Sequence, residues 1–163
     1  MKIEPSQNKE PIVSETYNAN INPKPGTIIV SCSDPRIRTA IRRFVEEKLK
    51  LAQGEFVPIN VAGGAAALAH RTKRPGDFFY IRDQIEFFCG HFTSIKRVVI
   101  IGHQDCGYYK TILNHPDKDD REKKDLPRAA EVITREIPGV TVDCYYARFL
   151  DESHAEIVFE MVQ

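Results

Sequence analysis

Apolar residues along the chain follow two different rhythms, which together predict a layered fold. Runs of apolar, mostly β-branched residues without alternation occur at 27–31 (TIIVS) and 97–102 (RVVIIG). Such runs are typical of strands in a parallel sheet that is covered on both faces. Between them, apolar residues recur at spacings of three and four, as on one face of a helix. The alternation predicts an α/β fold with a mostly parallel central sheet flanked by helices and right-handed crossovers.

The same patterns place the other elements. A helix is expected from Pro35 to about residue 49, with Asp34 as its N-cap. A later helix carries on one face Ile81, Ile85, Phe88, Phe92 and Ile95. Shorter or less regular helices are expected at 65–70, 108–113 and 127–137. Further strands are expected at 55–62, 140–145 and 155–162, with at least one of the last two at the sheet edge. The polar segment 115–125 is expected to be a solvated loop or an exposed helix end.

The length of 163 residues suits one domain with a single core. Residues 1–25 are polar and contain four prolines, so we expect an extended N-terminal arm lying on another surface, followed by one α/β domain at 26–163. The 23 Lys and Arg residues balance 23 Asp and Glu residues, which gives no electrostatic reason to expect nucleic acid or an anionic membrane as a partner. The first 25 residues lack the apolar stretch of a signal peptide, so the sequence predicts a soluble, cytoplasmic protein.

Chemically active side chains follow directly after the two clearest strands. Cys32, Asp34 and Arg36 come after the first strand, and His103 and Cys106 come after the second. Ligands of open parallel sheets bind beyond the carboxyl ends of the strands. If the two strands are neighbours, two sulfurs and one imidazole meet there. This donor set suits zinc and leaves a fourth position open, as in catalytic sites.

Each of these residues has a simpler interpretation when taken alone. A single cysteine is more often a core residue than a ligand, and Asp34 with Arg36 could be only an N-cap and a surface ion pair. The combination of two motifs, each between a strand and a helix, favours a site. Cys89 and Cys144 lack this context and are assigned to packing. Solvated surface side chains are the simplest interpretation of four histidines, His70, His91, His115 and His154.

The segments Ser31-Cys32-Ser33-Asp34-Pro35-Arg36 and Gly102-His103-Gln104-Asp105-Cys106-Gly107 resemble the paired signature of the short, single-domain beta-class carbonic anhydrases. The resemblance runs from about Thr27 to the C-terminal strands. It implies one Zn²⁺ per chain, held by Cys32, His103 and Cys106, in a catalytic domain at 26–163. It also implies a homodimer or higher homo-oligomer, and the reversible hydration of carbon dioxide to bicarbonate and a proton by zinc-bound hydroxide.

Asp34 and Arg36 form the neighbouring dyad in this resemblance. Asp34 would accept a hydrogen bond from the hydroxide, and Arg36 would hold the carboxylate in place. A free Asp34 could instead bind the zinc and close the site, so Arg36 would decide between the two states. The carbonic anhydrase family that the sequence resembles contains both open forms and forms closed by the aspartate.

The chain also departs from the family. Asn60-Val61-Ala62-Gly63 stands where the family commonly has Arg-Asn-Ala-Gly, and Tyr108 with Tyr109 follows Gly107, where a small residue is common. We expect the two tyrosines to pack within their helix. The surplus of aromatic residues at 78–92, Phe87 above all, predicts burial against a second copy of the chain. Two alternatives stay open: a zinc-dependent carbon disulfide or carbonyl sulfide hydrolase, and a catalytically silent zinc-binding homologue.

Overall fold

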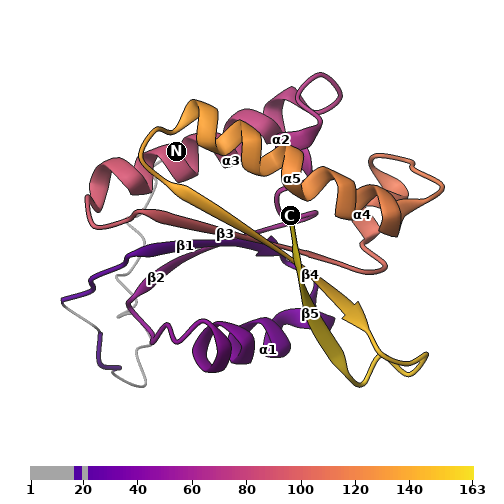
Figure 1. Cartoon of the computed structure of the whole chain (residues 1–163), viewed down its shortest axis with the longest axis horizontal. Helices are drawn as coiled ribbons and strands as arrows, with labels where there is room; N and C mark the ends of the chain where they lie inside the picture. The colour runs from indigo at the N-terminus through magenta and orange to yellow at the C-terminus, as the bar shows by residue number, and fades with distance from the viewer. Residues whose placement is uncertain (1–16, 20–21) are drawn as a thin grey trace, which may run out of the picture.

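The computed structural model describes residues 17–19 and 22–163, so most of the predicted arm, residues 1–16 and 20–21, lies outside the described residues. The described chain forms a five-stranded sheet in the order β2-β1-β3-β4-β5 (Figure 1). Its strands are Thr27–Cys32 (β1), Phe56–Val61 (β2), Arg97–His103 (β3), Thr141–Phe149 (β4) and Ile157–Val162 (β5). The first four strands pair in parallel, and β5 pairs antiparallel to β4. This confirms the predicted mostly parallel sheet with a C-terminal edge strand.

The central strands are buried on both faces, which explains the absence of alternation in their sequences. Every residue of β1 is buried. Its side chains divide between two cores: Ile28 and Val30 belong to one and Ile29 to the other, and β3 divides in the same way. Apolar residues are therefore needed at successive positions in the middle of these strands, and not at alternate ones.

Helices cover both faces of the sheet (Figure 1). α2 (Ala66–Ala69), α3 (Pro75–His91) and α5 (Lys118–Glu136) lie on one face, and α1 (Pro35–Arg43) lies on the other. The short α4 (Gly107–Thr111) follows β3, and a π-helical turn, Phe44–Lys48 (η1), continues α1 to about the predicted end. α3 ends at His91, so Phe92 and Ile95, expected on its apolar face, follow the helix instead.

The segment 115–125 differs most from its prediction. α5 begins at Lys118 and contains Pro127, where the sequence pattern placed the start of the helix. Two carboxylates of this segment, Glu122 and Asp125, are only 3% and 1% exposed, and the segment is therefore not the solvated stretch expected. Their burial depends on His103 of β3 and on His70, which directly follows α2, and the local pattern does not reveal these partners. Within the described residues, no helix combines the length and apolar character that crossing a bilayer requires.

Candidate metal centre

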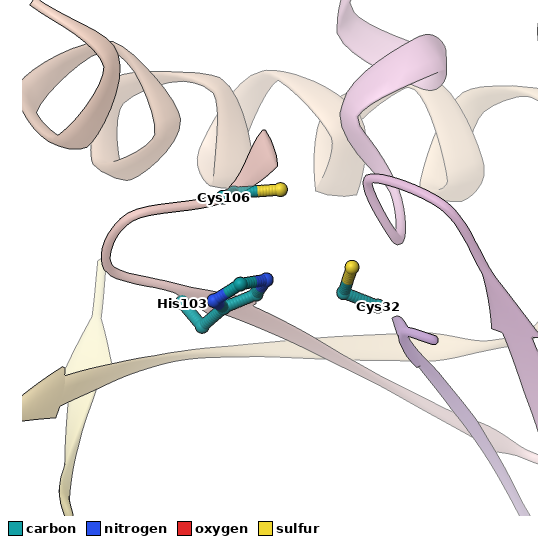
Figure 2. A group of neighbouring side chains, drawn as sticks. All are labelled: Cys32, His103 and Cys106. Carbon is teal, nitrogen blue, oxygen red and sulfur yellow. The ribbon is translucent and has the colours of Figure 1, made fainter. Parts of the chain in front are cut away.

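The three predicted ligands meet at the carboxyl end of the central strands. Cys32 is the last residue of β1 and His103 the last of β3. The two strands are neighbours, with Ser31 paired to Ile101. Cys106 follows the turn after β3 and caps α4. The two sulfurs and an imidazole nitrogen all lie within 4.8 Å of one another, and their side chains point toward a common space (Figure 2).

His103 presents a ring nitrogen whose lone pair is available. Nδ1 lies 2.8 Å from the carbonyl oxygen of Gln104, to which it donates. In the neutral ring, this bond places the proton on Nδ1 and leaves a lone pair on Nε2. Nε2 is buried and has no hydrogen-bond partner within the described part of the chain. A buried acceptor without a partner is costly in an ordinary core, but it is what a metal ligand requires.

The two thiols influence each other's pKa. The hydrogen bond with Cys106 lowers the pKa of Cys32 to about 4, despite the opposing effect of burial. The same bond, together with burial, raises the pKa of Cys106. A single negative charge is thus stable between the sulfurs, whereas two thiolates would repel each other unless a cation lay between them. Two sulfurs and one imidazole nitrogen therefore fit a divalent ion of the zinc type.

The loop from His103 to Cys106 is held by backbone bonds to two neighbouring elements. The N–H of His103 donates to Glu122 at 3.0 Å, and the N–H of Asp105 donates to Asp119 at 2.8 Å, both on α5. The N–H of Gln104 donates to the carbonyl oxygen of Ala147 on β4 at 2.8 Å. These bonds fix the loop that separates the two ligands.

Asp34 and Arg36 lie beside this cluster and contact each other closely. Asp34 is the N-cap of α1 and accepts the Arg36 N–H at 2.9 Å. Its two carboxylate oxygens also accept the Arg36 Nε at 3.1 and 3.2 Å and Nη2 at 2.7 Å. The bond from Arg36 holds the pKa of the Asp34 carboxyl below its usual range. Asp34 is therefore both a helix cap and one half of a forked ion pair, so the two interpretations of the sequence are compatible.

A glycine turn lets the chain pass close behind Cys32. Gly64 has φ +55°, and a Cβ there would lie 3.1 Å from the Cys32 backbone nitrogen. Gly63 has φ +76°, and a Cβ there would overlap the ring of Tyr108, 2.5 Å away. Both positions thus need glycine for conformation and for space.

The departures from the family have specific contacts. Asn60 accepts hydrogen bonds from Ser31 Oγ at 2.9 Å and from Arg38. Tyr108 packs against Gly63 and donates to Asp77 at 2.7 Å. Tyr109 is 1% exposed. Both tyrosines therefore pack against their surroundings, as expected.

The assignment of Cys89 and Cys144 to packing is also confirmed, since both contact the core that includes Ile133. The prediction for His70 is wrong. His70 is buried against Asp125, which also accepts hydrogen bonds from Tyr109 at 3.2 Å and Arg121 at 3.1 Å. No local signal reveals this cluster, because His70 directly follows α2 and the other members lie in α4 and α5.

The Asp125 cluster leads to a prediction about stability. Burial raises the pKa of Asp125, but the hydrogen bonds from His70 and Arg121 outweigh it and hold the pKa below the usual range. A lowered folded pKa stabilises the protein above the unfolded pKa of about 3.9, and this contribution is lost as the pH falls through the folded value. Asp125→Asn should lower the free energy of unfolding at pH 7 by about 2–3 kcal/mol.

Urea unfolding of both proteins measures this difference, which should shrink as the pH is lowered from 7 toward 3. Asp83→Asn, in which an exposed carboxylate is replaced on α3, is the control. A difference between Asp125→Asn and wild type that is independent of pH would contradict the charged pairing.

Residues 23–158 match a family model described as "Putative carbonic anhydrase". No curated protein matches the chain. Among solved structures, beta-carbonic anhydrase isoform I from Trichomonas vaginalis has a TM-score of 0.59 at 16% identity, covering 91% of this chain and 87% of that one. The beta-carbonic anhydrase CafA from Aspergillus fumigatus has a TM-score of 0.52 at 19% identity, covering 88% and 77%. A match described as tetrameric beta-carbonic anhydrases from Sordaria macrospora has a TM-score of 0.50 at 18% identity, covering 85% and 81%. At these identities the structures establish a shared fold.

Proposed function

The chain belongs to the putative carbonic anhydrase family, and from this premise we propose that it catalyses the reversible hydration of carbon dioxide to bicarbonate and a proton. One Zn²⁺ would be held by Cys32, His103 and Cys106. The observation that carries the proposal is the convergence of these three ligand atoms within 4.8 Å. A purely structural site would have no need of the Asp34–Arg36 pair beside it.

The proposed reaction divides the work between the ion and the side chains. Zn²⁺, when bound, would lower the pKa of a coordinated water so that hydroxide is available near neutral pH. Asp34 is ionised at that pH, as any ordinary carboxyl group would be, and Arg36 lowers its pKa further, so Asp34 can accept a hydrogen bond but cannot donate one. The hydrogen bond accepted by Asp34 would direct the proton of the water toward the carboxylate and a lone pair toward the substrate carbon. Arg36 keeps the carboxylate in this orientation through the forked pair.

Stopped-flow hydration with a pH indicator, run beside metal analysis, tests the proposal. We expect one zinc per chain and a kcat/KM of at least about 10⁴ M⁻¹s⁻¹ for carbon dioxide. Zinc without hydration, but with hydrolysis of carbon disulfide or carbonyl sulfide, would favour the first alternative. Zinc without either activity would favour a catalytically silent homologue. The absence of zinc would contradict both the proposed metal site and the proposed reaction.

We also propose that the protein is a homodimer or higher homo-oligomer. Three aromatic residues of α3, Phe79, Tyr80 and Phe87, are exposed by 39%, 57% and 58%, which is unusual for side chains of this size. The Sordaria macrospora relatives are described as tetrameric, which supports the same proposal. Light scattering at micromolar concentration tests it. A cytoplasmic location stays a prediction.

A further inference from the structure

Arg36 is held from two sides, and only one of them is Asp34. Its Nη1 donates to the Asp105 carboxylate at 3.1 Å, and its Nη2 donates to the Asp105 carbonyl oxygen at 3.1 Å. Asp34 takes the adjacent edge, through Nε and Nη2. The guanidinium therefore bridges the turn after β1 and the turn after β3, which are the two turns that carry the candidate ligands.

Asp105 has an unusual backbone conformation for this contact. Its φ is 60°, in the left-handed region that residues other than glycine seldom adopt, although Asp and Asn tolerate it best. Both its carboxylate and its carbonyl oxygen reach the same guanidinium in this conformation. Asp119 on α5 accepts the Asp105 N–H and anchors the turn from behind.

A second anchor matters because the Asp34–Arg36 pair is partly solvated. The Arg36 side chain is 38% exposed, and an exposed ion pair of a long side chain gains little once its conformational freedom is lost. The Asp105 carboxylate is itself 39% exposed, but Asp119 holds the backbone of its turn, so Asp105 supplies an anchored second partner. The centre of the Phe149 ring lies 5.7 Å from Cζ of Arg36. With its position fixed in this way, Arg36 holds Asp34 at a smaller entropic cost.

We infer that Asp105 is a positioning residue that acts through Arg36 and keeps Asp34 directed at the reacting water. The inference rests on the proposed function, in which Asp34 orients that water. Asp105 does not touch the reacting atoms. Its removal leaves the three metal ligands in place and weakens the hold on Asp34.

Because Asp105 has a left-handed φ, its carboxylate can be removed without straining the backbone. Asp105→Gly deletes the carboxylate but suits this backbone conformation and keeps the carbonyl oxygen. We expect it to lower kcat/KM about tenfold, with zinc affinity measured by chelator competition unchanged within about twofold. Asp105→Asn keeps one acceptor oxygen and should lose less than about threefold. Asn114→Gly is the matched control, since Asn114 has φ 49° in an exposed turn away from Arg36.

A double-mutant cycle separates positioning through Arg36 from a structural role in the turn. In an Arg36→Ala background, Asp105→Gly should cause no further loss beyond about twofold. The same tenfold loss in both backgrounds, or a parallel fall in zinc affinity, would show that Asp105 supports the turn and overturn the inference.

Nitrogen-15 NMR of the arginine side chains gives a readout that does not need turnover. In the wild-type protein, contacts on both edges should slow rotation about the Nε–Cζ bond of Arg36, and Asp105→Gly should speed it about tenfold. The signal that disappears in Arg36→Lys identifies the Arg36 side chain. If the wild-type protein binds zinc but does not hydrate carbon dioxide, the proposed function fails, and the NMR comparison then decides the role of Asp105. Equal rotation rates in the wild-type and Asp105→Gly proteins would overturn the inference that Asp105 positions Arg36.

Discussion

Replacing Cys106 with serine should remove zinc from the protein and lower carbon dioxide hydration at least about a thousandfold. A serine hydroxyl stays protonated near neutral pH, so it supplies neither the charge nor the soft donor of a thiolate. The remaining two ligands, Cys32 and His103, leave too few donors for tight binding. Metal analysis after dialysis, together with stopped-flow hydration, measures both effects.

Cys89→Ser is the matched control for this experiment. Cys89 is a half-buried cysteine that packs against the core and lies outside the cluster of ligand atoms. This variant should keep one zinc per chain and full turnover. A Cys106→Ser protein that retained both would exclude Cys106 as a ligand and, with it, the proposed site.

Arg36→Ala should lower kcat/KM about a hundredfold while zinc stays at one per chain. The loss would come from the orientation of Asp34 and not from its protonation. Without the Arg36 side chain, the pKa of the Asp34 carboxyl should rise toward its ordinary range, and the carboxyl would still be ionised at pH 7. The freed carboxylate could then move, and it could compete for the open position of the zinc.

Two further variants sharpen this result. Arg36→Lys keeps the charge but lacks the planar fork, so its activity should lie between those of wild type and Arg36→Ala. Arg43→Ala is the control on the same helix, because Arg43 is 66% exposed. Within the described chain, its one ion pair is with Glu47. Normal turnover in Arg36→Ala would refute the role of the dyad, and loss of zinc would assign Arg36 to the metal loop instead.

Much of the fold could be predicted because the relevant signals are local. Two buried strands reveal themselves through apolar runs such as that of β3, and α1 through its spacing, its N-cap Asp34 and Pro35. The mistakes arose where long-range contacts override local pattern. α5 runs through Pro127, and its polar first half carries Glu122, which is buried because its oxygen accepts the N–H of His103, 19 positions earlier.

The candidate site, too, could be predicted from the sequence only in part. The ligand types and their positions after two strands were visible in the sequence, as was the dyad of Asp34 and Arg36. The partners that hold these groups were not. Asp105 contacts Arg36 across 69 positions, and His70 contacts Asp125 across 55.

The sequence by itself determined which residues could serve as ligands and which segments become strands, since both follow from side-chain chemistry and from short-range periodicity. Only the tertiary structure decided that β1 and β3 are neighbours, that Nε2 of His103 is left without a partner among the described residues, and that Asp105 holds a second edge of Arg36. The physical reason is that burial and hydrogen bonding are satisfied by whichever groups the folded chain brings within about 3 Å, and sequence separation sets no limit on which groups those are.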